Sequence, residues 1–338
     1  MVRNHIIPMF IPHIGCPHQC VFCDQRRISG AAQPVTPEQV RAALRAALPH
    51  CTGSAEAAFY GGSFTAMAPA YQQSLLNAVQ PFLEDGSVSS IRISTRPDAV
   101  DAAALERLRR AGVRTIELGC QSMDPDVLRC SGRGHGREAV FHAAEAVRRG
   151  GFRMILQMMT GLPGDTEQSA LRTARTLADL RPDGVRIYPT VVVRGTELHR
   201  RYLEGTYRPQ TVEDATELCA KLLPIFLEAE IPILRIGLQA TEELRAGGAV
   251  AGAYHPALGE LVRSRVYRRR ACELLSAQTG RTAVTLGVAP NRVSLMVGQK
   301  RCNLIWLQER FSISRIKVVA ADVGDWQILL QSPPDISP

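Results

Sequence analysis

The first 240 residues alternate short apolar segments with amphipathic ones, and this alternation constrains the fold more than any other feature. Six apolar segments have the length and composition of strands, and they cover residues 9–14, 56–62, 90–97, 115–121, 153–159 and 184–190. Strands joined by crossover helices form a parallel sheet. The sequence therefore predicts an α/β fold, a partial (β/α)6 TIM-like barrel, which residues 233–239 could extend as a seventh strand.

Helical patterns fill the intervals between these strands. Thr36 is a predicted N-cap, with Pro37 at the first helical position and Gln39 completing a capping box. Other helices are predicted at 101–112, 136–151, 166–180 and 211–230, and the first two of these end on basic residues followed by glycine. After Gly248 the pattern breaks. We therefore predict a barrel domain over 1–250 and a small basic α+β domain over 262–332.

The composition predicts a cytoplasmic protein. The N-terminus does not resemble a signal peptide, and no apolar run is long enough to span a membrane. The nine cysteines are then expected to be thiols or metal ligands. The net charge is +8, and the stretch from Leu261 onwards holds twelve Lys and Arg against five Asp and Glu, which leaves +7 there. Such a segment indicates a polyanionic partner or a solvated, arginine-rich surface.

Three cysteines follow the first predicted strand within eight residues. Cys16, Cys20 and Cys23 are separated by gaps of three and two residues. Four thiolates would complete the shell of a zinc ion or an iron–sulfur cluster. Three thiolates can hold three irons of a four-iron cluster and leave the fourth iron open to another ligand. A zinc site that recruits His13 or His18 is the alternative.

The stretch CPHQCVFC resembles the C-x-x-x-C-x-aromatic-C motif of the radical S-adenosylmethionine (SAM) superfamily. This resemblance implies that the three cysteines bind a [4Fe-4S] cluster whose open iron is chelated by SAM. It also implies a reducing electron donor, such as flavodoxin or ferredoxin, and cleavage of SAM to methionine and a 5′-deoxyadenosyl radical. Phe22 matches the residue that packs on the adenine. In FYGGSFTAM, Gly61 and Gly62 match the motif at the methionyl amino group, and Ser63 and Thr65 add hydroxyls.

Residues 8–245 resemble the radical SAM domain of the Elongator catalytic subunit, which modifies wobble uridines in tRNA. The similar segments include GGSFTAM, STRPDAV, ELGCQSMD, GRGH, GLPGDTEQ and RPDGVRIYPTVVVRGTEL. The resemblance implies cofactor-binding roles for Thr95, Arg96, Glu117, Arg133 and Gln157, and catalytic roles for Gln121, Arg186 and Tyr188. It places Asp98, Ser122, His135, the turn 161–164, Thr190 and Arg194 near them. Glu117 could instead be a structural charge paired inside the barrel.

Two departures from that subunit limit what the resemblance implies. The first two cysteines are closer together here. About 77 residues follow position 262, fewer than a C-terminal acetyltransferase domain needs. Acetyl transfer is therefore not implied by the resemblance.

The segment 293–319 resembles the core of a KH domain, in which a G-x-x-G loop between two helices clamps a nucleic-acid backbone. The loop here is 298–301, with arginine in place of the second glycine. Residues 263–270 add five arginines that could contact phosphates. The alternative is a basic helical cap on the barrel.

Taken together, these patterns predict a radical SAM enzyme that modifies RNA, specifically a tRNA base, and binds it through the basic C-terminal segment. One alternative is a radical SAM enzyme acting on a small molecule or porphyrin, similar to the oxygen-independent coproporphyrinogen oxidases. Another is a non-catalytic iron–sulfur protein that binds RNA.

Overall fold

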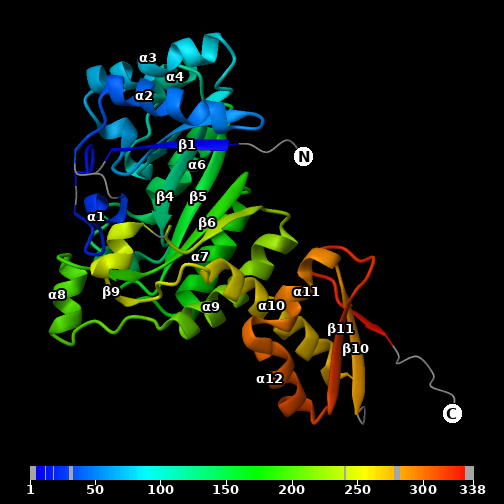
Figure 1. Cartoon of the computed structure of the whole chain (residues 1–338). Helices are drawn as coiled ribbons and strands as arrows, with labels where there is room; N and C mark the ends of the chain where they lie inside the picture. Colours follow the sequence, from blue (N-terminus) through cyan, green and yellow to red (C-terminus); the bar gives the residue numbers. More distant parts are fainter. Residues whose placement is uncertain are drawn as a thin grey trace. The chain divides into compact units, whose positions relative to one another are not determined.

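The computed structural model describes residues 5–11, 13–17, 19–29, 33–239, 241–277 and 282–331. The chain divides into two compact units (Figure 1), the first formed by Met1–Val212 with Ile225–Pro256 and the second by Glu213–Pro224 with Ala257–Pro338. The predicted helix 211–230 is present as α9 (Val212–Glu228). Its middle stretch groups with the second unit, a grouping that the sequence pattern did not predict.

The first unit contains a curled, seven-stranded parallel sheet, which confirms the predicted α/β half-barrel. Its strands, in spatial order, are β1 (His5–Phe10), β2 (Ala55–Tyr60), β3 (Ser90–Thr95), β4 (Val113–Gln121), β5 (Arg153–Thr160), β6 (Gly184–Pro189) and β8 (Ile233–Ile236). Spatial order follows chain order, so all the carboxyl ends meet at one rim. The candidate seventh strand is thus present as β8.

Helices follow the strands as predicted. They are α1 (Gln25–Ser29), α2 (Pro37–Ala47), α3 (Pro69–Glu84), α4 (Ala102–Arg110), α5 (Pro125–Cys130), α6 (Arg137–Arg149), α7 (Glu167–Asp179) and α8 (Glu197–Leu203). The capping box at α2 forms: Thr36 Oγ1 accepts from Gln39 N at 3.3 Å, and Gln39 Oε1 accepts from Thr36 N at 2.8 Å. None of the described helices combines the length and apolar content that a membrane crossing requires.

A short antiparallel pair, which the sequence analysis did not predict, lies beyond the carboxyl end of β6. It joins β7 (Val191–Val193) to β9 (Ala249–Gly252). Val191 and Val193 form a buried cluster with Leu244, against which Leu238 and Tyr254 pack.

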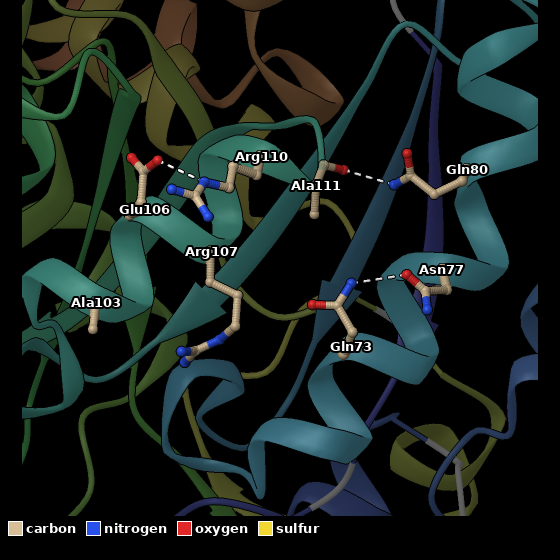
Figure 2. Close-up of a pocket in the computed structure, with 8 residues that line it drawn as sticks. All are labelled: Gln73, Asn77, Gln80, Ala103, Glu106, Arg107, Arg110 and Ala111. Carbon is tan, nitrogen blue, oxygen red and sulfur yellow. Dashed lines mark hydrogen bonds and ion pairs between the residues drawn. The ribbon is translucent and has the colours of Figure 1, made fainter.

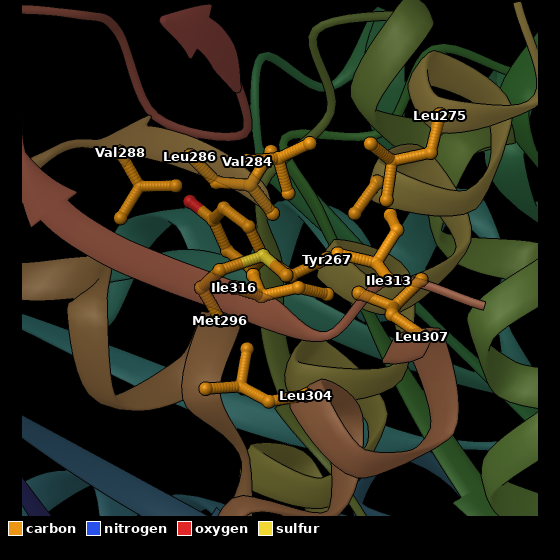
Figure 3. Packing of buried hydrophobic residues seen from close by; sticks show 11 residues of the cluster. Tyr267, Leu275, Val284, Leu286, Val288, Met296, Leu304, Leu307, Ile313 and Ile316 are labelled. Atoms are coloured by element: carbon orange, nitrogen blue, oxygen red, sulfur yellow. The ribbon is translucent and has the colours of Figure 1, made fainter. Parts of the chain in front are cut away.

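Besides the stretch of α9, the described part of the second unit contains a three-stranded sheet and the helices α10 (Leu258–Ser276), α11 (Val293–Val297) and α12 (Cys302–Phe311). The strands of the sheet are β10 (Ala283–Val288), β11 (Arg315–Ala320) and β12 (Leu329–Gln331). Strand β10 lies between β11, to which it is parallel, and β12, to which it is antiparallel. The chain from β10 to β11 therefore runs strand, helix, turn, helix, strand. Figure 3 shows its core, where Tyr267 of α10 and Leu307 of α12 pack together with residues of both parallel strands.

Three of the five arginines in 263–270 have partners within this unit. Arg265 pairs with Glu213 and Glu217, and Arg268 shares Glu217 at 2.8 Å. Arg268 also lies over the ring of Trp306, with its guanidinium carbon 4.6 Å from the ring centroid. The third, Arg270, donates to the carbonyl of Trp326. Much of this positive charge therefore holds the unit together.

Truncation of two aliphatic side chains of α12 to alanine tests this packing. Leu307 is fully buried, whereas Ile305 is 48% exposed. We expect Leu307→Ala to lower the free energy of unfolding by about 2–5 kcal/mol, because burial is lost and a cavity remains. Ile305→Ala should change it by about 0.5 kcal/mol or less. Urea denaturation measures both, and equal losses would contradict the described packing of α12.

Candidate active site

A cavity of about 670 Å³ lies inside the half-barrel, at the carboxyl ends of its strands. Most of the residues predicted from the sequence line it, and these are Cys16, Cys20, Phe22, Cys23, Gly61, Gly62, Thr95, Arg96, Glu117, Gln121, Arg133, Gln157, Arg186 and Tyr188. The lining does not include Ser63 or Thr65. Strand ends at this rim are where (β/α) barrels carry their chemistry.

A second hollow, of about 650 Å³, lies between α3 and α4 (Figure 2). Its side chains pair with one another: Gln73 donates to Asn77 at 2.8 Å and Arg110 to Glu106 at 2.7 Å. It contains neither a cysteine nor a strand end, so the chemistry of the chain points to the first cavity.

The cysteine loop between β1 and α1 is held by backbone contacts. Val21 N donates to the Ser131 carbonyl at 3.1 Å, and Cys23 N to the Cys20 carbonyl at 3.0 Å. The ring of His13 accepts from Gln25 N at 2.8 Å, so this histidine has a structural partner. Among the described residues, no three His, Cys, Asp or Glu side chains converge on a position for one metal ion. A four-iron cluster differs in this respect, because each cysteine binds a separate iron.

Burial and repulsion from Cys20 disfavour ionisation of the Cys16 and Cys23 thiols. Burial raises the pKa of Cys23 to about 12, and the neighbouring Cys20 adds to the shift. The pKa of Cys16 is also raised, first by burial and then by Cys20, although Arg96 and Arg133 oppose the rise. Bound iron would supply the missing positive charge, because metal ligation displaces the thiol proton.

Gly62 fits against the cysteine loop so closely that no other residue could replace it without movement. Its φ is +53°, and a Cβ there would lie 2.2 Å from the Ile14 carbonyl oxygen and 2.8 Å from that of Ile11. The next residue, Ser63, donates its backbone N–H to the same Ile14 oxygen at 2.9 Å. The glycine motif therefore positions the loop that carries the cysteines, besides lining the cavity.

The hydroxyl groups expected at the cofactor instead bond to one another. Thr95 Oγ1 lies 2.8 Å from Ser63 Oγ and 2.6 Å from Thr65 Oγ1. Ser63 Oγ also accepts from Arg96 N at 3.2 Å. This network joins the ends of β2 and β3, so Ser63 and Thr65 act on the cavity through Thr95. A cofactor-binding role for these two residues stays a prediction.

Two buried arginines lie beside the cysteines. Arg133 donates to Cys20 Sγ at 3.3 Å and to the Gly119 carbonyl at 2.5 Å, while Arg96 forms a two-pronged pair with Asp98 at 2.8 and 2.9 Å. Each still has one buried nitrogen without a partner, Arg96 Nη1 and Arg133 Nε. Buried donors normally have acceptors. These two atoms therefore indicate an acceptor-bearing group next to the cysteine loop.

Glu117 is the centre of a buried charge network. It is fully buried and accepts from Arg92 at 2.8 Å and from Arg186 at 2.9 and 3.0 Å. Gln157 and Tyr60 donate to it as well, at 2.9 and 3.1 Å. Burial alone would raise the pKa of Glu117, but Arg186 and Arg92 outweigh it and hold the pKa below its usual value. These contacts support the alternative that Glu117 is a structural charge paired inside the barrel. They also support positioning roles for Gln157 and Arg186.

Gln121 and Tyr188 are the two other predicted catalytic residues that line the cavity. Gln121 ends β4 with φ +66°, a conformation that costs free energy in a residue other than glycine and is often found at functional sites. Tyr188 lies near Arg186, and burial raises the pKa of its hydroxyl.

Several residues that the resemblance placed at the site do not line the cavity. Thr190 is buried and donates to the Thr160 carbonyl at 2.7 Å, and Arg194 is exposed and donates to the Gly247 carbonyl at 3.2 Å. The turn 161–164 and the side chains of Asp98, Ser122 and His135 are also outside the lining. Any effect of these positions on the cavity is therefore indirect.

Sequence reasoning missed three contributors. Gln25 donates to Cys23 Sγ at 3.4 Å, and Phe10 pairs its ring with Tyr60 at 6.3 Å between centroids. Arg235 lines the cavity from β8. The signal for Arg235 was available, because it is a charged residue inside an otherwise apolar strand.

Comparison with known proteins shows which family the chain resembles. A model of the radical SAM superfamily matches residues 10–177, and a model of the radical SAM C-terminal domain matches residues 182–268. The tRNA uridine(34) acetyltransferase of Dehalococcoides mccartyi is 28% identical over 280 residues, which cover 69% of this chain and 61% of that protein. Elongator complex protein 3 of Mus musculus is 29% identical over 200 residues, covering 53% of this chain and 36% of that protein. This chain therefore spans less than two thirds of either relative.

A solved structure shares the fold. The archaeal Elp3 of Methanocaldococcus infernus, with an N-terminal deletion, matches with a TM-score of 0.63 at 22% identity. The match covers 80% of this chain and 64% of that one.

Replacement of Gly62 tests its fit against the cysteine loop. We expect Gly62→Ala to displace the Ile14 carbonyl and to lower the iron bound per chain after anaerobic reconstitution. Gly86→Ala is the matched control, because Gly86 also has a positive φ of +76° but a Cβ there would meet nothing within 4 Å. Iron and sulfide analysis measures the difference. Normal loading of the Gly62 variant would show that the glycine does not position the loop.

Proposed function

Because this chain belongs to the radical SAM superfamily, we propose that it cleaves SAM reductively at a [4Fe-4S] cluster and uses the resulting radical to modify a base of tRNA. The single observation that carries the proposal is the loop after β1, which presents Cys16, Cys20 and Cys23 to a cavity whose other walls contain unpartnered arginine donors.

The residues present fit the cluster and SAM. Three thiols from one loop leave a coordination position open, as SAM chelation requires. The unpartnered Arg96 Nη1 and Arg133 Nε can donate to anionic groups there, because a guanidinium binds carboxylates and similar oxyanions well. The paired glycines 61 and 62 let the backbone approach a ligand closely. When bound, the cluster supplies the electron that cleaves SAM.

The chain itself contributes positioning and exclusion of water. Arg133 donates to Cys20 Sγ, an interaction that stabilises negative charge on this sulfur. Phe22 lines the cavity next to the cysteines and offers an apolar face to the adenine. Arg186 is held in place by Glu117, and Gln121 and Tyr188 present polar groups to the substrate side. We propose Arg186, Gln121 and Tyr188 as the catalytic residues.

The tRNA part of the proposal rests on the relatives. Two of them are named for uridine 34 of tRNA, and each is matched over more than two thirds of this chain. We therefore propose the wobble uridine as the base that is modified. The porphyrin alternative is not favoured, since the two relatives described above are a tRNA uridine(34) acetyltransferase and an Elongator protein. A cytoplasmic location and a flavodoxin or ferredoxin as electron donor follow from this chemistry as parts of the proposal.

The second unit supplies a candidate RNA contact. Its strand–helix–turn–helix–strand order has the turn at the KH-like loop, where Lys300 and Arg301 are exposed with φ of +50° and +64°. Asn303 fixes this turn by donating to the carbonyls of Leu295 and Met296 at 3.1 Å each. Neither basic side chain has an ion-pair partner within the described part of the chain. The loop therefore presents two unpaired cations in a fixed conformation, suitable for backbone phosphates.

Cysteine replacement tests the cluster. We expect Cys16→Ala, Cys20→Ala and Cys23→Ala each to abolish the four-iron absorption and the reductive formation of 5′-deoxyadenosine, because each removes one iron ligand. Cys51→Ala is the control, since Cys51 lies outside the cavity lining. Anaerobic reconstitution followed by chromatography of the SAM products measures both properties. A variant that keeps cluster and cleavage identifies a wrong ligand.

Charge removal in the KH-like loop tests the RNA contact. We expect the double variant Lys300→Ala/Arg301→Ala to reduce the slope of log affinity against log salt by about 1–2, because each lost phosphate contact removes roughly 0.7–0.9. The double variant Arg315→Ala/Lys317→Ala is the control, with the same charge change at exposed positions of β11. Filter binding of tRNA at several salt concentrations measures the slopes. Equal slopes for both double variants would exclude a specific role for the loop.

A further inference from the structure

The lining of the active-site cavity carries an excess of positive charge. Four arginines line it, Arg96, Arg133, Arg186 and Arg235, against one carboxylate, Glu117. Glu117 is already engaged, because both of its oxygens accept from Arg186 and one accepts from Arg92. The cavity therefore has more cations than its own walls can neutralise.

The excess can be assigned to one residue on the side of the cavity formed by β6 and β8. Arg96 pairs with Asp98, and Arg133 donates to Cys20 Sγ beside the cysteine loop. Arg186 pairs with Glu117. The side chain of Arg235 has no ion pair or hydrogen bond within the described part of the chain.

The position of Arg235 in the sheet directs it toward the same space as Arg186. The two residues are register partners on the adjacent strands β8 and β6. Tyr188, two residues after Arg186, is close enough for the charge of Arg235 to act on its hydroxyl. The cavity lining also includes apolar side chains, such as Met159, Val191 and Leu238.

This arrangement is unfavourable unless an anion completes it. An arginine side chain stays protonated in proteins, so it cannot relieve the repulsion from Arg186 by losing its charge. A partly buried cation beside another cation and apolar groups costs free energy that a bound oxyanion would offset. Arg186 is less available to bind an oxyanion, because its Nε and one Nη already donate to Glu117.

We propose that Arg235 binds a backbone phosphate of the RNA substrate, adjacent to the base that enters the cavity. This inference rests on the proposed function and names the subsite that would hold the nucleotide. The paired rings of Phe10 and Tyr60 line the same cavity and offer an aromatic face to a base. The carboxylate of SAM is the other available oxyanion, but Arg96 and Arg133 are better placed for it, because Arg133 donates to Cys20 Sγ and each has a buried nitrogen without a partner.

The test combines a protein variant with a neutral RNA linkage. The RNA is an anticodon stem–loop with uridine at the wobble position, made either with natural phosphates or with a methylphosphonate on one side of that uridine. The proteins are the cluster-loaded full chain and its variants Arg235→Gln, Arg235→Lys and Arg153→Gln. Arg153 is the matched control, because it is an exposed arginine at the opposite end of the strands, at the start of β5.

We expect Arg235→Gln to weaken binding of the natural RNA roughly 10- to 100-fold, as loss of a charge-assisted contact does. Arg235→Lys should lose less, and Arg153→Gln should match the wild type. One of the two methylphosphonate RNAs should bind wild-type protein as weakly as natural RNA binds Arg235→Gln, with no further loss when both changes are combined. Iron content, measured in parallel, separates these effects from misfolding.

Other outcomes would overturn the proposal. The affinity losses caused by Arg235→Gln and by the methylphosphonate could multiply when the variant binds the modified RNA. If they multiply for both methylphosphonate RNAs, Arg235 does not contact either phosphate. Weaker SAM binding by Arg235→Gln in equilibrium dialysis, with unchanged RNA binding, would assign the arginine to the SAM carboxylate instead. Absence of RNA binding by the wild type would overturn the tRNA proposal itself, whereas binding that Arg235→Gln leaves unchanged would overturn only the role of Arg235.

Discussion

The buried carboxylate of Glu117 is the interaction on which the interior of the half-barrel depends. Through its contacts with Arg92, Arg186, Gln157 and Tyr60, it joins side chains from β2, β3, β5 and β6 to β4. A buried ion network of this kind is costly to break, because removing one member leaves the others charged and unpaired. It also fixes the rotamers of the side chains that line the cavity, which is the preorganisation that the proposed radical reaction needs to direct a reactive species at one atom.

The positions of the elements could be predicted from the sequence because local signals and tertiary packing agree in the barrel. The six β-α units, the candidate seventh strand and the Thr36 capping box are all present. The cysteine and glycine motifs could also be recognised, since each needs only a short stretch of chain. Which polar side chains reach a ligand was harder to predict. Ser63, Thr65 and Glu117 carry the expected residue types, but their partners come from other strands, so only the folded chain shows that they bond to protein groups.

The partners of the basic residues in 263–270 were hard to predict for the same reason. The arginines of 263–270 are closely spaced in the sequence, yet Arg265 and Arg268 are neutralised by Glu213 and Glu217, which are about fifty residues away in the chain. The acidic residues lie in the stretch of α9 that groups with the second unit. Net charge along a sequence thus overstates the positive surface that is available to RNA. The sequence understates the importance of Arg235, a single charged residue in an apolar strand. In the fold it is the cation at the cavity whose charge has the fewest partners.

The half-barrel is open, since the described strands β1 and β8 form the two edges of the sheet and do not pair with each other. Both edges contribute to the cavity, β1 through Ile6, Pro8 and Phe10 and β8 through Arg235. A closed barrel admits only what fits through its mouth, which suits free metabolites. An interior bordered by two sheet edges is also approachable from the side. A nucleotide in the middle of a long polymer could therefore be presented to it without either end of that polymer having to thread through a ring of strands.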